Sequence, residues 1–236
     1  MSKARKIIEE VLSEGRNFLL ESEAKMVIAD YGIPVTKFEI ATNEDEAVEA
    51  ANRIGYPVVM KILSPDIIHK SDVGGVKLNL KNDQEVRQAF KEIIENVRKF
   101  KSDADIRGVT VQEMAPEPVA EVIVGMTKDP QFGPAIMFGL GGIFVEVLKD
   151  VSFRIAPLTA YDAREMIQEI KGYPVLTGIR GRPPADIDTL VNIILNVSKL
   201  VMEIEEIDQL DLNPIFAYSK GAKTVDARII LSKPEE

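Results

Sequence analysis

A single histidine and the absence of cysteine limit the chemistry open to this sequence of 236 residues. Disulfides, thiolate metal sites and cysteine nucleophiles are excluded, and any imidazole chemistry must use His69. His69 lies in the segment SPDIIHKSDVGG, residues 64–75, beside Lys70 and before two consecutive glycines. Glycines let backbone amides approach an anion, so one interpretation is a phosphate-binding loop. The other is a flexible loop with a solvated histidine, and neither a Walker A nor a GxGxxG pattern decides between them.

Lys61 is the one charged residue in the apolar run VVMKIL, residues 58–63. A lysine inside a buried strand costs desolvation energy unless something pairs with it, which would suit a phosphate ligand. The alternative is a strand with one solvated face, and this pattern taken alone favours that alternative.

Three polar residues near the C-terminus, Asp211, Asn213 and Asp226, predict a cation site. Asp211 and Asn213 are two residues apart in an expected strand, so their side chains share a face. Asp226 lies on the next expected strand, beyond a short turn at 219–221, and can come close to Asn213. One carboxylate and one amide oxygen suit Mg²⁺, which shares ligands with nucleotide phosphates. The alternative is a polar pair on an exposed face.

The tripeptide Gln112-Glu113-Met114 ends an expected strand just before the turn APEP, residues 115–118. Such a strand end could offer backbone hydrogen bonds to a purine edge. Glu121, in the following strand, could accept hydrogen bonds from ribose hydroxyls. Taken alone, either carboxylate is better explained as a surface group.

Helical and strand patterns alternate along the chain and indicate an α+β (α/β) protein of two lobes. Apolar spacing and capping residues predict helices over residues 3–13, 22–31, 43–54, 86–97, 161–171 and 186–203. Strands are expected over residues 35–40, 58–63, 76–80, 109–114, 120–126, 135–138, 208–218 and 222–231. We expect the lobes to be residues 1–109 and 110–236, with APEP as either a hinge or a stiff surface turn.

The charge balance excludes broad classes of partner. There are 29 Lys and Arg against 38 Asp and Glu, a net charge of −9, which argues against a nucleic-acid binder. The N-terminus has no secretory pattern, and the longest uncharged stretch, residues 130–145, is short and broken by glycines. We expect a cytoplasmic protein without membrane contact, and its abundant charges without cysteine point to a heat-adapted, thermophile source.

These motifs, in this order, resemble the ATP-grasp domain of nucleoside-diphosphate-forming acyl-CoA synthetases, and among them the β subunits of the ADP-forming acetyl-CoA type. The resemblance covers residues 15–232 and rests most on segments 55–80, 138–158, 177–186 and 210–215. Succinyl-CoA synthetase β subunits carry a glycine- and arginine-rich loop where this chain has IIHKSD, which favours the acetyl-CoA type.

The resemblance implies an ATP-grasp fold whose two lobes clamp a nucleotide, with ADP or ATP as substrate and Mg²⁺ as cofactor. It places Lys61 at the phosphates, Glu113 and Met114 beside the adenine, and Glu121 at the ribose. It makes Asn213 and Asp226 the Mg²⁺ ligands, His69 a transiently phosphorylated histidine, and Asp211 the residue that steadies it. Arg154, Arg180 and Arg182 are further candidates for phosphate or partner contacts.

The implied reaction is acetyl-CoA + ADP + phosphate ⇌ acetate + CoA + ATP. No CoA-binding fingerprint is visible, so we expect an α subunit to supply the acyl-CoA chemistry in an α2β2 assembly, and this chain to be inactive alone. The Met start and the KPEE end favour a separate subunit over a fragment of a fused one. Three alternatives remain: a subunit for another acyl-CoA (aryl, branched or succinyl), a non-catalytic nucleotide-sensing module, and a stand-alone ATP-grasp ligase.

Overall fold

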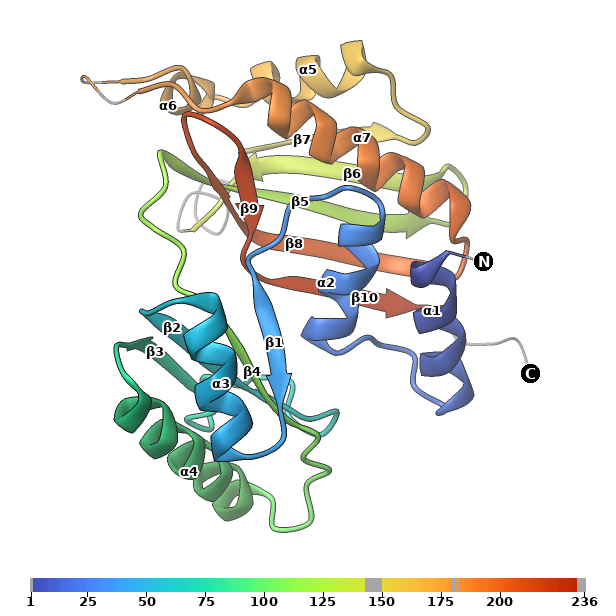
Figure 1. Cartoon of the computed structure of the whole chain (residues 1–236). Coiled ribbons are helices and arrows are strands. Elements are labelled where there is room, and N and C mark those ends of the chain that lie inside the picture. Colours follow the sequence, from blue (N-terminus) through green and yellow to red (C-terminus); the bar gives the residue numbers. More distant parts are fainter. Residues whose placement is uncertain (1, 143–149, 180, 182, 233–236) are drawn as a thin grey trace. The chain divides into compact units, whose positions relative to one another are not determined.

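The computed structural model describes residues 2–142, 150–179, 181 and 183–232, which form two compact units (Figure 1). Unit 1 comprises residues 1–35 and 117–236, and unit 2 comprises residues 36–116. This division differs from the expected lobes, 1–109 and 110–236, because the first 35 residues belong with the C-terminal part of the chain. Ile8, Val27 and Ile28 are fully buried in the core of unit 1, which is why the N-terminal segment packs there.

Unit 2 is a four-stranded antiparallel sheet with two helices. The strands run in the order β1–β4–β2–β3, with bounds Phe38–Ala41, Gly108–Glu113, Val58–Leu63 and Val76–Leu80. The helices are α3 (Glu44–Ile54) and α4 (Asp83–Phe100). Asn43 and Asn82 cap them, since each side chain accepts a hydrogen bond from the backbone N–H three residues on.

The two faces of this sheet differ. Met60, Ile62, Val109 and Val111 pack against α3 and α4 in a core of their own. Because side chains alternate along a strand, Lys61 projects from the opposite face.

Unit 1 is built on a six-stranded antiparallel sheet (Figure 1). Its order is β10–β8–β5–β6–β7, with bounds Ala227–Leu231, Ile207–Ala217, Ala120–Asp129, Gly133–Leu140 and Val151–Ile155. The short strand β9 (Ala222–Thr224) pairs with the end of β8, in line with β10.

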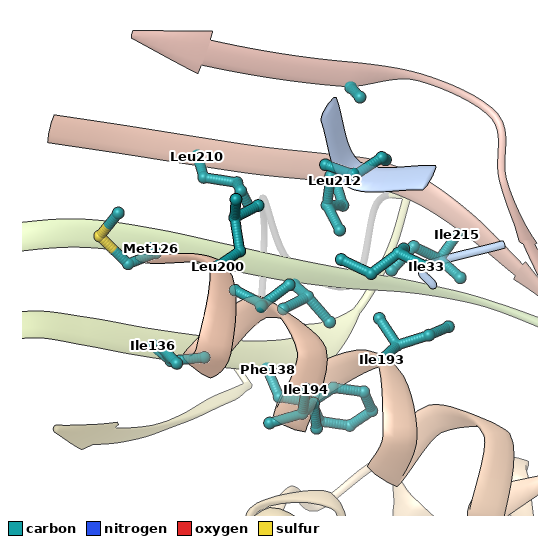
Figure 2. Close-up of a cluster of buried hydrophobic side chains, with 14 of the residues drawn as sticks. Ile33, Met126, Ile136, Phe138, Ile193, Ile194, Leu200, Leu210, Leu212 and Ile215 are labelled. Carbon is teal, nitrogen blue, oxygen red and sulfur yellow. The ribbon is translucent and has the colours of Figure 1, made fainter. Parts of the chain in front are cut away.

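Helices contribute to one large core on one face of this sheet. They are α1 (Lys3–Ser13), α2 (Glu21–Asp30), α5 (Ala160–Glu169), α6 (Tyr173–Leu176) and α7 (Ile187–Glu203). Figure 2 shows how Phe138 and Leu210 from the strands meet Ile194 and Leu200 from α7. The opposite face of the sheet is thereby left to carry polar side chains.

The expected elements agree with most of the observed ones, with three differences. β7 and the four-residue helix α6 were not expected, and the strand expected over 222–231 is broken into β9 and β10. In the described part of the chain, no helix is both long and apolar enough to span a bilayer.

Candidate functional site

A pocket of about 440 Å³ lies on the face of the six-stranded sheet opposite its core, which we call the pocket face. Leu210 and Leu212 of β8 are buried in the core, so Gln209, Asp211 and Asn213 project to the pocket face. The pocket is lined entirely by residues of unit 1: Ile123, Gly125, Met126, Thr127, Ala135, Met137, Phe153, Gln209, Leu210, Asp211, Asn213, Arg228 and Ile230.

Asn213 and Asp226 lie across from one another in the strand register. Ala227 pairs with Leu212, and the backbone N–H of Val225 donates to the carbonyl of Pro214 at 3.0 Å. Asp226 stands between these two contacts, in the break between β9 and β10, and therefore opposite Asn213. The structure thus brings together the two oxygen donors that the sequence suggested for a cation.

Asp211 shares the pocket face with these donors. The surrounding pocket desolvates its carboxylate and the charge of Asp226 repels it, so the pKa of Asp211 is raised above its ordinary value. The Arg228 guanidinium, from the paired position on β10, acts in the opposite direction. The ionised form of Asp211 is therefore less favourable than that of an ordinary aspartate, and a nearby cation or hydrogen-bond donor would favour it.

Glu121 begins β5 on the same face as Asn213 and Asp211. Its backbone carbonyl accepts a hydrogen bond from Gly141 N–H at 2.8 Å, and its exposed side chain lies beside Gly142. A Cβ at Gly141 would stand 3.2 Å from that of Glu121, so this glycine permits the close approach. Unit 1 therefore aligns Glu121, Asn213 and Asp211 along one face.

Lys61 occupies the middle of β2 in unit 2, paired with Thr110 on β4 and Val76 on β3. Its side chain is only 8% exposed, which contradicts the solvated-face alternative favoured by the pattern alone. On the same face, Gln112 is 2% exposed and the Thr110 hydroxyl donates weakly to the Lys61 carbonyl at 3.5 Å. Sequence reasoning passed over Thr110, although strand alternation groups it with Lys61 and Gln112.

The loop of residues 64–75 uses the amides of its two glycines for its own turns. The Gly74 N–H donates to the Ser71 carbonyl at 3.1 Å, and the Gly75 N–H donates to the Lys70 carbonyl at 2.8 Å. Both glycine amides are therefore used inside the loop, and they are not the anion-binding donors that the phosphate-loop interpretation assumed. Gly75 instead permits close packing, since a Cβ there would stand 2.7 Å from Ile62 Cγ2.

His69 projects from this loop and is exposed. Its backbone carbonyl accepts a hydrogen bond from the Asp72 N–H at 3.3 Å, which anchors the turn. Its imidazole forms no hydrogen bond or ion pair with the described residues, so the exposed ring is accessible to a reactant.

Glu113 and Met114 end β4 as expected, but both of their amides are engaged. The Glu113 N–H donates to the Lys37 carbonyl at 2.9 Å, and the Met114 N–H donates to the Pro57 carbonyl at 3.2 Å. The Glu113 carboxylate in turn accepts from the Lys37 N–H at 2.8 Å. Because these amides are occupied, they are not the purine contacts that the strand end suggested; Met114 still presents a side chain that is 39% exposed.

The arginine candidates separate into two cases. Arg154 on β7 forms an ion pair with Glu169 at 2.8 Å, which accounts for its charge within unit 1. Arg180 and Arg182 lie outside the described residues. Arg228, which lines the pocket, was not among the candidates, although its position two residues after Asp226 in a strand could have suggested it.

The predicted residues thus form two groups. Unit 2 holds Lys61, His69, Glu113 and Met114, and unit 1 holds Glu121, Asp211, Asn213 and Asp226. Over the ranges that the structure describes, no three His, Cys, Asp or Glu side chains gather as a metal site. A cation at Asn213 and Asp226 would need further oxygen ligands from water or from a substrate.

Comparison with known proteins identifies the class to which this fold and this site belong. Residues 10–231 match the ATP-grasp domain family. The chain belongs to this family, and within it to the β subunits of ADP-forming acetate–CoA ligases.

Three relatives illustrate the relationship. The chain is 59% identical, over 98% of its length and 99% of the relative, to the β subunit of acetate–CoA ligase [ADP-forming] I of Pyrococcus furiosus. It is 50% identical to 4-hydroxybutyrate–CoA ligase [ADP-forming] of Nitrosopumilus maritimus, over 97% of this chain and 33% of that longer protein.

The third is a solved structure of dinucleotide-forming acetyl-coenzyme A synthetase 1 of Ca. Korarchaeum cryptofilum. It is 50% identical over 98% of this chain and 100% of the matched chain, with a TM-score of 0.87. That structure holds coenzyme A and Mg-AMPPCP, and its phosphohistidine segment points towards the nucleotide binding site. The ATP-grasp fold and the membership of a ligase family, both expected from the sequence, are confirmed.

Proposed function

We propose that this chain is the nucleotide-binding subunit of an ADP-forming acetyl-CoA synthetase and that it passes a phosphoryl group through His69 to ADP. The observation that carries the proposal is the arrangement of Asp211, Asn213 and Asp226 around one pocket face. Oxygen donors in this arrangement suit a nucleotide phosphate bound with a divalent cation. The solved relative, which holds Mg-AMPPCP, supports the same assignment.

The proposed transfer step takes place between His69 and ADP. The phosphoryl group on a ring nitrogen of His69 moves to a β-phosphate oxygen of ADP. The N–P bond breaks and its electron pair stays on the nitrogen, while a lone pair of the ADP oxygen forms the new P–O bond of ATP. The exposed imidazole suits this role because a ring nitrogen of histidine can act as a nucleophile and His69 is accessible to the solvent.

The other residues would position the nucleotide and the histidine and neutralise charge on the phosphates. Lys61 would contact the phosphates, Glu121 the ribose, and Glu113 with Met114 would border the adenine. Asp211 would accept a hydrogen bond from the second ring nitrogen of the histidine and so hold its tautomer. Catalysis of this kind depends mainly on positioning and electrostatics.

Mg²⁺ fits the donor set of this chain. Asn213 and Asp226 are oxygen donors opposite one another in the register, and they leave most of the coordination shell to water and phosphate. When bound, the ion would neutralise charge on the phosphate oxygens.

A partner subunit would supply the acyl-CoA chemistry. The relative from Pyrococcus furiosus is itself a β subunit of nearly the same length, and a longer relative contains this region as a third of one chain. We propose an α subunit with this chain in an α2β2 assembly, located in the cytoplasm.

The decisive experiment uses the chain reconstituted with its α subunit. Incubation with labelled ATP should leave acid-labile phosphate on His69, located by mass spectrometry of the peptide. His69→Ala should abolish both this label and ATP formation while ADP still binds, and Ser71→Ala in the same loop should keep both. Near-normal turnover by His69→Ala would refute the relay.

The same experiment separates the rival functions. A nucleotide sensor would bind ADP and show no histidine label, and a stand-alone ligase would turn over without the α subunit.

A second acyl specificity is favoured by one observation. The relative named as a 4-hydroxybutyrate–CoA ligase is 50% identical across almost all of this chain. Specificity would then reside in the partner, and comparing kcat/KM for acetate and 4-hydroxybutyrate in the reconstituted complex would decide it.

A further inference from the structure

Arg228 enters the pocket from β10, at the position paired with Asp211 on β8. The register continues from Asp211 to Gly125, then to Met137 and Phe153. These five residues form one transverse row across the sheet, and all of them line the pocket. We call them the Arg228 row.

The guanidinium of Arg228 is available for a ligand. Arg228 is exposed, and among the described residues it has neither a hydrogen bond nor an ion pair, although an aspartate stands directly across from it. Paired positions on neighbouring antiparallel strands have Cβ atoms about 5 Å apart, and an arginine is long enough to extend past such a neighbour. Its head can therefore reach an anion in the pocket without breaking a side-chain hydrogen bond or an ion pair with the described residues.

The order of polar residues along the pocket face matches the order of groups along a nucleotide. Side chains on one face of a strand repeat about every 7 Å. Glu121, the proposed ribose contact, lies at one end of this face. Asn213 and Asp226 come next along the strand direction, and the Arg228 row comes after them. The Arg228 row thus lies one step beyond the proposed cation donors, on the side away from the ribose.

The floor of this row is low at Gly125, which has no side chain, and the end of the Met137 side chain lies over it. A Cβ there would stand 3.1 Å from Met137 Cε, so even one methyl group would crowd the floor. Arginine presents N–H groups in a planar fork that matches phosphate oxygens, and such charge-assisted bonds are stronger than neutral ones.

We propose that Arg228 binds the terminal phosphoryl group of ATP, the group that is transferred, above the floor at Gly125. The inference rests on the proposed nucleotide function and extends it to a residue outside the predicted set. Arg228 then acts on the terminal phosphate rather than on the nucleoside or the inner phosphates.

Calorimetric titration of the full chain with ATP, ADP and AMP, in the presence of Mg²⁺, tests the inference. Arg228→Met should weaken ATP binding by at least about tenfold and leave ADP and AMP binding within about twofold. Arg228→Lys should fall between the two, because it keeps the charge and loses the fork. Lys199→Met, on the exposed side of α7, removes the same charge from unit 1 and should change nothing.

The outcomes are separable. Equal ATP affinity in Arg228→Met and the unmodified chain, with unchanged thermal unfolding, would overturn the inference. An equal loss for ATP and ADP would also overturn it, because the contact would then be to the inner phosphates. If the unmodified chain bound neither ATP nor ADP, the proposed nucleotide function would fail and this inference with it.

Discussion

Asp211, for which we propose a role in phosphoryl transfer, also affects the stability of the fold. Its pKa is raised because the pocket desolvates the carboxylate and Asp226 repels it, while Arg228 compensates in part. A carboxyl group whose pKa is higher in the folded state than in the unfolded state takes up a proton on folding. The free energy of unfolding therefore rises as the pH falls from above the folded pKa towards the unfolded one.

We expect Asp211→Asn to increase the thermal stability of the chain at pH 7 by a few degrees at most and to flatten this part of its pH dependence. The same variant should form less ATP in the reconstituted enzyme, because the amide cannot replace the carboxylate charge. Calorimetry at several pH values in EDTA measures the first effect. Asp208→Asn, on the same strand, is the control, and a lower Tm for Asp211→Asn would contradict the assignment.

The positions of several candidate site residues could be predicted from the sequence, because strand geometry determines which side chains share a face. The side-chain period of two placed Asp211 and Asn213 on one face, and the short turn brought Asp226 opposite Asn213. The glycine amides were not predictable, because their partners are the Lys70 and Ser71 carbonyls, chosen by the conformation of the whole loop. Lys61 was ambiguous for a similar reason, since alternation gives its face but not its burial.

Among the elements, the loop between β2 and β3 depends on one close contact. Gly75 lies against Ile62 on β2, and a Cβ there would also stand 2.9 Å from the Lys70 carbonyl oxygen. The Gly75 carbonyl accepts from the Ile62 N–H at 2.8 Å, which joins the loop to the strand. A larger residue would therefore displace the turn that carries His69.

We expect Gly75→Ala to cost about 1–3 kcal/mol of unfolding free energy and to reduce the phosphorylation of His69, while nucleotide binding by the chain persists. Denaturant unfolding and the histidine-label assay measure the two effects. Gly221→Ala is the matched control, since its φ of +79° adds backbone strain but nothing lies within 4 Å. Equal labelling in Gly75→Ala and the unmodified chain would show that the loop tolerates the shift.

Most helices and strands could be predicted because their apolar periods and caps are local signals. Asn43, for example, caps α3 as expected and Gly55 ends it. The strand β7 was missed because it is only five residues long, although its alternation of Ser152 and Arg154 with apolar neighbours is a strand signal. The break between β9 and β10 was missed because no glycine or proline marks it; at the break, the Val225 N–H donates to the Pro214 carbonyl.

For the molecule as a whole, the division into two units predicts that a core mutation destabilises mainly the unit that contains it. Ile8 in α1 and Ile93 in α4 are both fully buried, one in each core. Truncating either to alanine should cost about 2–5 kcal/mol. The two variants should differ in which unit is destabilised.

We expect Ile8→Ala to speed amide hydrogen exchange in β8 and β10 while β2 and β4 remain protected, and Ile93→Ala to do the reverse. Exchange followed by mass spectrometry distinguishes the two patterns. Faster exchange in β2 and β4 of Ile8→Ala would instead support the boundary near residue 109 that the sequence suggested. The sequence does not show to which unit residues 1–35 belong, because no local pattern tells a helix which sheet it will cover.

The assignment of residues 1–35 to unit 1 has a consequence for biosynthesis. Helices α1 and α2 are made first, whereas β8 and β10, whose side chains share their core, are made last. At about 5–20 residues per second, the apolar faces of these helices wait roughly 10–40 seconds for their partners. Unit 2, which is continuous in the chain, can fold during that interval. The segment of residues 1–35 is therefore where we expect chaperone binding and aggregation to concentrate until β8 and β10 have been made.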